Sequence, residues 1–403
     1  MVRAANLAAA LTIGRLYGPA ILGLYGASLA VVTIVFMFAD GGLQLSAITE
    51  IGPASQRAPC IVGEFYLSKV ILCAFAVLFL VATGVYGVFP HDYWVIAGFI
   101  TLRTLIQSYS QLQIAILKSL FRMRLIGLVQ AFHAGVLFLA IGVAFIQRWT
   151  ITPFLELLVV GQSLELLFMT AAVFWTRILP RWPSLSACLA LIRRSILLGL
   201  GYALANLIVR LDVVILSFVV ALPELGQFSA ADNLLVVVYL AAWLFASVLL
   251  PEMVKLSDSA DVLDRFLTRW TRIAYTFVLP ASLFLFFIAP LVITSLYGSE
   301  FAHAGALASW MILACPFIVS NSLSLHHTIA MGAKHAYLKI MFATALSVVI
   351  LDYFLARYFG STGVVAAILI RESLLSVLLW LRHSRIRARS IVIGVSFPTR
   401  WMS

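Results

Sequence analysis

Charged side chains are scarce in this sequence. Asp, Glu, Lys and Arg make up 11% of its 403 residues, whereas hydrophobic residues make up 63%. An ordinary soluble domain has about 25% charged and about 45–50% apolar residues. A water-soluble protein of this length could not bury so much apolar surface, and a disordered chain contains far less of it. The composition therefore argues against a soluble enzyme and predicts that much of the chain faces lipid.

Residues that bind metals or carry out catalysis are also few. The four cysteines, Cys60, Cys73, Cys188 and Cys315, lie within or beside apolar runs and lack the spacing of metal ligands. They are typical of small core residues. No spacing indicates a zinc site, a nucleophile triad or a phosphate-binding glycine loop. The sequence accordingly predicts no metal, no cofactor and no enzymatic activity.

Long apolar runs take the place of charge. A helix needs about 20 apolar residues to cross a hydrocarbon core of about 30 Å. The first run is too short to cross unaided, which leaves an abbreviated start or a tilted, incomplete helix; a cleaved signal peptide is disfavoured because no small-residue cleavage site follows. The runs predict an all-α polytopic membrane protein with about twelve transmembrane helices, at residues 2–14, 20–47, 64–88, 93–117, 125–146, 152–176, 195–219, 226–250, 273–296, 304–331, 336–356 and 362–381.

The basic residues predict the orientation of these helices. Most of the 27 Lys and Arg residues fall on the two termini and on alternate connections, whereas the opposite connections carry only Arg15, Arg148 and Arg357. Positive charge marks the cytoplasmic side of a membrane protein, so both termini are predicted to be cytoplasmic. The net charge of +11 is then a marker of topology and not of nucleic-acid binding. The basic tail could also touch anionic membrane lipids, although a stop-transfer role is favoured.

Two short echoes indicate an internal repeat. Leu22-Gly-Leu-Tyr-Gly-Ala resembles Leu225-Gly-Gln-Phe-Ser-Ala, and Val85-Tyr-Gly resembles Leu296-Tyr-Gly. Six helices in each half give both halves the same orientation, so they predict two bundles related by a pseudo-two-fold near the membrane normal, around a central cavity. The expected bundles are residues 1–185 and 186–385, followed by a basic cytoplasmic tail at 386–403. The outward connections are too short for a separate catalytic domain.

Several of these segments also resemble a known family. They are Gly14-Arg-Leu-Tyr-Gly-Pro, Leu22-Gly-Leu-Tyr, Phe38-Ala-Asp-Gly-Gly-Leu, Arg210-Leu-Asp, Gly226-x-Phe-x-Ala-Ala, Leu249-Leu-Pro-Glu, Leu296-Tyr-Gly-x-x-Phe and Gly332. In order and spacing they are similar to the polysaccharide-lipid flippases, the O-antigen and exopolysaccharide repeat-unit translocases of the multidrug/oligosaccharidyl-lipid/polysaccharide exporter superfamily. The chain departs from the family in its short first helix and in Gln227-Phe228, where Leu-Tyr is commoner.

The resemblance implies a function. Such a protein would translocate an undecaprenyl-diphosphate-linked oligosaccharide across the bacterial inner membrane by alternating access, for O-antigen, capsule or exopolysaccharide synthesis. Its partners would be the lipid-linked substrate, membrane lipids and, in the same pathway, a polysaccharide polymerase and glycosyltransferases. The alternatives are a cation-coupled multidrug exporter of the same superfamily and, less favoured, a membrane-embedded polymerase or ligase, which would need a larger outer loop.

Arginines within the predicted helices are the candidate substrate-binding residues. An ionisable group at mid-bilayer is costly and usually faces a cavity or a partner. Arg103 shares one helical face with Gln107, Ser110 and Gln111, and this face is predicted to line a cavity. Arg210 follows Asn206 by one turn, and Arg371 lies near the middle of the last helix. A guanidinium can bind a diphosphate through two hydrogen bonds, while the structural alternative pairs each arginine with a carboxylate on a neighbouring helix.

Carboxylates within the helices are candidates for ion coupling. Asp40, Glu165 and Asp212 could bind a cation or a proton, although each is favoured as the partner of an arginine. Asp352 is expected to pair with Arg357 near the outer surface, and Lys69 is expected to extend to the cytoplasmic surface. His133, His326 and His327 are interpreted as hydrogen-bonded interior histidines. A drug exporter should line its cavity with aromatics and carboxylates, so three membrane arginines favour the flippase.

Overall fold

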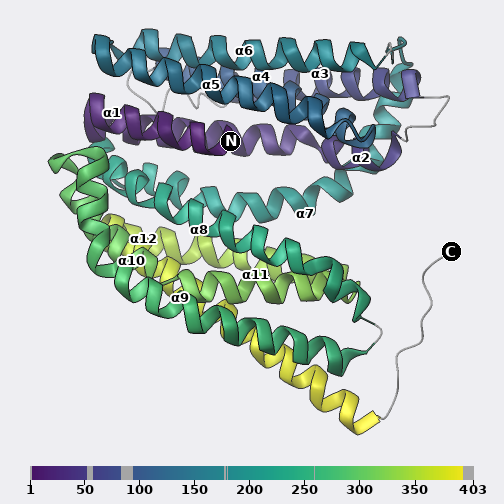
Figure 1. Ribbon diagram of the computed structural model, residues 1–403, viewed down its shortest axis with the longest axis vertical. Coiled ribbons are helices and arrows are strands. Elements are labelled where there is room, and N and C mark those ends of the chain that lie inside the picture. The colour runs from purple at the N-terminus through teal and green to yellow at the C-terminus, as the bar shows by residue number, and fades with distance from the viewer. Residues whose placement is uncertain are drawn as a thin grey trace. The chain divides into compact units, whose positions relative to one another are not determined.

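The computed structural model describes residues 2–51, 58–82, 94–176, 178, 180–257 and 259–393. Over these residues the chain is almost entirely helical and contains no strand (Figure 1). It divides into two compact units, Met1–Val214 and Ile215–Ser403. The boundary lies inside a long helix, later in the chain than the join predicted at residues 185 and 186.

The first unit is a bundle in which two helices each contact both α1 and α6. Its helix α4 packs against α1 and α6, and α5 packs against α1 and α6 (Figure 1). The helices are α1 (Val2–Asp40), α2 (Leu43–Glu50), α3 (Ala58–Ala82), α4 (Trp94–Ser119), α5 (Met123–Gln147), α6 (Ile151–Trp175) and most of α7 (Leu185–Ser217). Phe65, Leu112, Met169 and Leu191 bring α3, α4, α6 and α7 into one apolar core.

The second unit has a matching arrangement. Here α10 and α11 together contact α8, α9 and α12. Its elements are α8 (Leu222–Lys255), α9 (Ala260–Tyr297), the short helix η3 (Ser299–Phe301), α10 (Ala302–Ile312), α11 (Cys315–Ala330) and α12 (Lys334–Ile393). The predicted tail at 386–403 is therefore helical as far as Ile393, and residues 394–403 lie outside the described part of the chain.

Breaks within the long helices reconcile these elements with the twelve predicted spans. Gly18 interrupts α1 at φ 80°, just before Pro19, so α1 comprises two helices that meet at a kink. They correspond to the first two predicted spans, and the first helix reaches beyond residue 14. Gly360 interrupts α12 at φ 58° between the last two predicted spans. The tenth predicted span consists of α10 and α11, which meet at a bend of 48°.

The break in α12 is held by a side chain from another helix. Glu224, in the first turn of α8, accepts a hydrogen bond from the backbone N–H of Ser361 at 2.8 Å. The positive φ of Gly360 ends one helix, so the first backbone N–H groups of the next helix have no intrahelical partner. The Glu224 carboxylate accepts a hydrogen bond from one of these N–H groups. Gln227 similarly joins α8 to the start of α10, accepting from the N–H of Ala304 at 2.9 Å. These bonds fix one end of the second unit.

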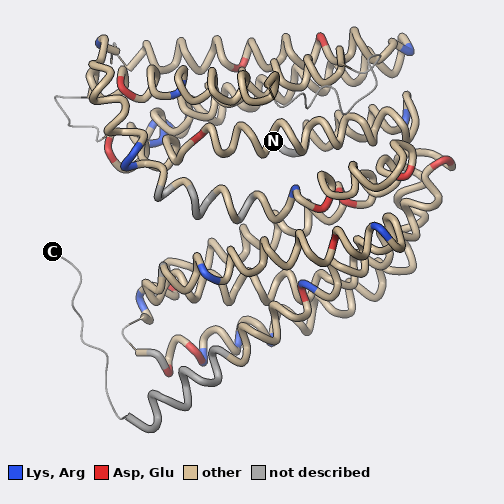
Figure 2. Tube along the Cα trace, turned by 180° about the vertical axis from the view of Figure 1, so that it is seen from behind, with Lys and Arg blue, Asp and Glu red and all other residues tan. Residues whose placement is uncertain are grey.

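The described helices satisfy the physical requirements of a polytopic membrane protein. Seven of them are long and apolar enough to cross a membrane, if α1–α2 and α12 are each counted once. The number is eight when the bent pair α10–α11 is counted as one further span. Large apolar side chains such as Phe75, Phe79, Phe284 and Phe287 stand exposed along α3 and α9, as expected of surfaces in lipid. Charged residues are sparse in both units, and many lie near helix ends (Figure 2).

One helix contact within each unit bears on the predicted repeat, which itself stays a prediction. In the first unit the part of α1 after Gly18 is the second predicted span, and α4 is the fourth. They are in contact through the hydrogen bond between Arg103 and Tyr25. In the second unit α8 contacts α11 through Ser247 and His326, the eighth and tenth predicted spans. The second and fourth spans of each half are therefore neighbours within their own unit.

Candidate functional site

Arg103 is a buried cation near the middle of α4. Arg103 is 7% exposed, and its side chain points toward α1. One terminal nitrogen donates to the hydroxyl of Tyr25 at 3.1 Å, and the other donates to the side-chain oxygen of Asn6. Its Nε has no hydrogen-bond partner. Among the described residues no carboxylate lies within ion-pair distance of this guanidinium, so the alternative of an internal ion pair is not realised there.

The three polar residues predicted to share a face with Arg103 differ in how deeply they are buried. Gln107 and Gln111 are half-buried, whereas Ser110 is fully buried and donates to the backbone oxygen of Ile106 at 3.3 Å. The predicted stripe missed Gln113, which turns toward α6 and donates to the hydroxyl of Thr170 at 2.6 Å. Only the two glutamines therefore remain available beside Arg103 on this helix.

Arg210 lies in the last part of the first unit, on α7. It is half-buried, and no carboxylate is within ion-pair distance among the residues that the structure describes. Asp212, two positions later on the same helix, is buried and has interactions of its own. The side chain of Asn206 lies outside the described residues, so its predicted alignment with Arg210 stays a prediction.

Asp40 is paired with a lysine and not, as predicted, with an arginine. The Nζ of Lys69 lies 2.6 Å from Oδ1 of Asp40, and the lysine side chain is fully buried. Gln44 adds a hydrogen bond to the same carboxylate at 3.1 Å. The prediction that Lys69 extends to the surface is therefore wrong, because a carboxylate within hydrogen-bond reach holds the ammonium inside the bundle.

Glu165 likewise has a different partner from the one expected. It is buried in α6, and its Oε2 lies 3.0 Å from Nδ1 of His133 on α5. Gln162, one turn before it, donates to the same carboxylate. A histidine therefore replaces the predicted arginine. His133 is an interior residue, as interpreted from the sequence, but neither of its ring nitrogens makes a hydrogen bond within the described part of the chain, and its contact with Glu165 is an ion-pair approach.

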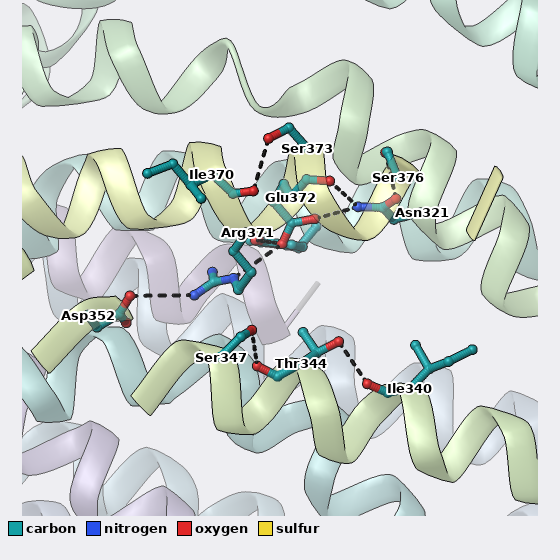
Figure 3. Close-up of polar contacts among 11 residues, drawn as sticks. Asn321, Ile340, Thr344, Ser347, Asp352, Ile370, Arg371, Glu372, Ser373 and Ser376 are labelled. Carbon is teal, nitrogen blue, oxygen red and sulfur yellow. Dashed lines mark hydrogen bonds and ion pairs between the residues drawn. The ribbon is translucent and has the colours of Figure 1, made fainter. Parts of the chain in front are cut away.

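Arg371 belongs to a buried polar cluster in the second unit (Figure 3). One of its terminal nitrogens lies 3.9 Å from Asp352, and its Nε lies 3.6 Å from Glu372. All three residues are almost completely buried. The prediction that Asp352 pairs with Arg357 is not met, because Asp352 faces Arg371 and Arg357 donates instead to the hydroxyl of Tyr353 at 3.2 Å. For Arg371 the ion-pair alternative is realised.

Glu372 is the central acceptor of this cluster, and sequence reasoning missed it. Its carboxylate accepts from the hydroxyl of Tyr239 on α8 and from the amide of Asn321 on α11, each at 2.8 Å. Asn321 is fixed in turn by a bond from Ser376 at 2.7 Å (Figure 3). The cluster joins α8, α11 and α12. Glu372 could have been found by noting an Arg-Glu dipeptide within an apolar run.

The two neighbouring histidines of α11 take separate roles. His327 is buried with its Nε2 3.1 Å from Asp264 on α9, and His326 contacts the hydroxyl of Ser247 at 3.2 Å. His326 is a hydrogen-bonded interior residue, as interpreted from the sequence, whereas the ring nitrogens of the buried His327 make no hydrogen bond among the described residues and its polar contact is the approach to Asp264. They connect α11 to α9 and α8.

A protein-family comparison decides the classification. The model of a family described as polysaccharide biosynthesis protein matches residues 12–306. The chain belongs to this family. None of the curated proteins matches the chain in sequence. The fold of this member is that of a polytopic membrane protein.

Solved structures of transporters share the fold. An inward-facing multidrug resistance MATE transporter of the MOP superfamily is similar with a TM-score of 0.75 and 14% identity, over 96% of this chain and 95% of that one. The lipid II flippase MurJ, in an inward closed conformation, is similar with a TM-score of 0.78 and 12% identity, over 94% of this chain and 85% of that one. A MOP-superfamily transporter from Pyrococcus furiosus is similar with a TM-score of 0.62 and 15% identity, over 96% and 92%. These neighbours confirm the predicted fold class.

Proposed function

We propose that this family member translocates an undecaprenyl-diphosphate-linked oligosaccharide repeat unit across the bacterial inner membrane by alternating access. The observation that carries the proposal is Arg103, a buried guanidinium in a membrane helix whose described neighbours include no carboxylate. Placing such a charge at the centre of a helix costs about 2.5–3.5 kcal/mol on insertion scales, so it is retained where it has a function. An anionic ligand would compensate the charge.

The guanidinium of Arg103 is suited to a phosphate group. Arginine has five N–H donors in a planar fork, and the bonds to Tyr25 and Asn6 use two of them. These two bonds orient the group. Nε is buried without a partner among the described residues, and the remaining terminal hydrogens are the ones proposed to bind phosphate oxygens. The diphosphate of a lipid-linked glycan offers several such oxygens. The half-buried amides of Gln107 and Gln111 on the same helix could then donate to and accept from sugar hydroxyls.

Arg210 and Arg371 take different places in this proposal. Arg210 is half-buried without a described carboxylate partner, so we keep it as a second anion-binding residue. Arg371 faces Asp352 and Glu372, which already supply opposite charge. We therefore assign Arg371 to the architecture of the second unit. The residues proposed for substrate binding are Arg103, Gln107, Gln111, Asn206 and Arg210.

Ion coupling, if it drives transport, would use a buried carboxylate. Asp40 is held by Lys69 and is the weaker candidate, since its charge is already balanced. Glu165 is the stronger candidate because its partner, His133, can itself gain or lose a proton. Asp212 remains a third candidate on α7. The second candidate function is a cation-coupled multidrug exporter, and the number of buried carboxylates supports it. However, Asp40 and Glu165 already face Lys69 and His133, whereas Arg103 has no carboxylate partner among the described residues, which favours an anionic substrate.

The proposed setting follows from the substrate. The glycan lipid would be built by glycosyltransferases on the cytoplasmic side and consumed by a polymerase on the outer side, so these enzymes are the proposed pathway partners. We also propose that both termini are cytoplasmic, on the strength of the distribution of basic residues.

A reconstituted flipping assay tests this function. The purified chain would be placed in vesicles that contain a fluorescent undecaprenyl-diphosphate oligosaccharide, and a membrane-impermeant reductant would bleach the outer leaflet. We expect the protein to expose the protected inner pool, and to leave fluorescent phosphatidylcholine protected. A fluorescent cationic drug, trapped in parallel vesicles, serves as the alternative substrate. Drug efflux without movement of the glycan lipid would overturn the proposal.

A further inference from the structure

A pocket of about 640 Å³ opens at one end of the first unit. It is formed by residues 121–125, which connect α4 to α5, together with Trp175 and Thr176 at the end of α6. This volume lies in the range of about 300–1,000 Å³ that is typical of small-ligand sites. None of these residues belongs to the proposed substrate site. The pocket therefore requires a separate explanation.

The lengths of the helices place this pocket at the level of lipid headgroups. α5 and α6 each have 25 residues, which corresponds to about 37 Å at 1.5 Å per residue. The hydrocarbon core is about 30 Å thick, so the helix ends extend a few ångströms beyond it. Trp175 is 81% exposed at the end of α6, where tryptophan is enriched in membrane proteins.

The pocket carries positive charge without a protein counter-charge. Arg122 and Arg124 are both exposed on its wall, and no carboxylate within the described part of the chain is in ion-pair distance of either. Two arginines side by side repel each other unless water, ions or an anionic ligand compensates them. At headgroup level an anionic phospholipid is the most concentrated such ligand.

The turn that forms the pocket presents an apolar side chain beside these charges. Phe121 has a positive φ of 56°, a conformation that is rare for a bulky residue. This residue is 77% exposed. Such exposure is unfavourable in water but matches the glycerol and upper acyl region of a bilayer. The combination of Phe121, Trp175 and two arginines thus matches an amphipathic ligand.

We infer that this pocket binds the headgroup of an anionic glycerophospholipid. Arg122 and Arg124 hold the phosphate oxygens, and Phe121 and Trp175 pack against the glycerol and the first methylenes of the acyl chains. The inference is independent of the transported substrate, because the pocket contains none of the residues proposed for substrate binding. A failure of the flipping assay would leave it unchanged.

Native mass spectrometry of the full chain tests the lipid site. The protein would be released from micelles that contain equal amounts of phosphatidylglycerol and phosphatidylcholine, and the bound lipids would be counted. We expect the wild-type chain to retain one phosphatidylglycerol in preference to phosphatidylcholine. Since each basic residue near an anionic lipid contributes about a fivefold preference, Arg122→Gln with Arg124→Gln should reduce the preference about 25-fold.

A matched pair of substitutions separates the pocket from general surface charge. Arg269 and Arg272 are exposed arginines on α9, outside the pocket. Arg269→Gln with Arg272→Gln removes the same charge and should leave the retained lipid in place. Trp175→Ala should weaken retention while keeping both charges. Excess inorganic phosphate should fail to displace the lipid, because phosphate lacks the apolar contacts.

Three outcomes would overturn the inference. They are an equal retention of the two lipids by the wild-type chain, an equal loss in the two arginine double variants, and complete displacement by inorganic phosphate. Because all substituted residues are exposed, the variants should fold, and size-exclusion chromatography in detergent checks this directly.

Discussion

Lys69 on α3 and Asp40 at the end of α1 form a buried ion pair, with Nζ and Oδ1 2.6 Å apart. The pair ties two helices that are far apart in the chain, and it lies beside the break between α1 and α2 at Gly41 and Gly42. A buried charge that loses its partner is strongly unfavourable, whereas replacement of both partners by neutral groups is often tolerated. The pair therefore makes a sharp prediction about stability.

Removing one member of this pair should destabilise the protein more than removing both. We expect Asp40→Asn or Lys69→Met alone to lower the free energy of unfolding by about 3–5 kcal/mol, and the double variant to recover most of this loss. Thermal unfolding in detergent measures the effect. Lys255→Ala is the matched control, because its pair with Glu252 at 3.3 Å is exposed and should contribute about 0–1 kcal/mol. Equal losses in the single and double variants would contradict the pairing.

The cluster around Arg371 allows a test of its structural role. Arg371→Ala leaves Asp352 and Glu372 buried together without their cation, so we expect low protein abundance in the membrane. Adding Asp352→Asn and Glu372→Gln should restore abundance. Immunoblots of membranes, read beside a glycan-export assay, distinguish the two roles. A well-expressed Arg371→Ala chain with lost export would instead return Arg371 to the substrate site.

Gly199 on α7 should tolerate no side chain. A Cβ at this position would overlap the backbone of Gly41 and Gly42, where α7 crosses the break between α1 and α2. Overpacking of this kind costs about 1–3 kcal/mol, so Gly199→Ala should lower the midpoint of thermal unfolding. Gly98→Ala on α4 is the control, because a Cβ there meets open space and should favour the helix. Similar midpoints for the two variants would contradict this close approach.

The orientation in the membrane can be tested by cysteine labelling. The basic residues predict that Ser257 faces the cytoplasm and Ser299 the opposite side. In a background with Cys60→Ala, which removes the exposed native thiol, Ser299→Cys should react with an impermeant maleimide in intact cells. Ser257→Cys should react only after lysis. Labelling of Ser257→Cys in intact cells would reverse the predicted topology.

The fold was more accessible from the sequence than the polar contacts were. Apolar runs bounded by charge or glycine define helices because the bilayer leaves few alternatives for a backbone. Glycine could mark the breaks at Gly18 and Gly360, since both need positive φ. At each break two helices meet at a kink, in agreement with the separate spans predicted on either side of it.

The partners of buried charges could not be read from the sequence. Asp40 and Lys69 are 29 positions apart on different helices, and their contact depends on how α1 packs against α3. The Arg371-Glu372 dipeptide marks Glu372 as an unusual charge in an apolar run, but consecutive residues point in different directions on a helix, so its partners on α8 and α11 could not be predicted. Arg103 was identifiable because a lone cation in an apolar run is unusual whatever its partners are.

Arg103 finally provides the most direct link between a residue and the proposed function. Arg103→Ala should keep normal abundance, because removal of the guanidinium leaves no described carboxylate unpaired. It should reduce glycan export about tenfold or more, as expected for the loss of a charge-assisted contact to phosphate. Arg103→Lys retains the charge but not the planar fork, so intermediate export is expected. Arg148→Ala is the control, since this arginine is an exposed cap of α5. Export assays read beside membrane immunoblots provide the measurement. Normal export by a well-expressed Arg103→Ala chain would remove Arg103 from the substrate site, because a buried cation that binds the diphosphate cannot be lost without a change in transport.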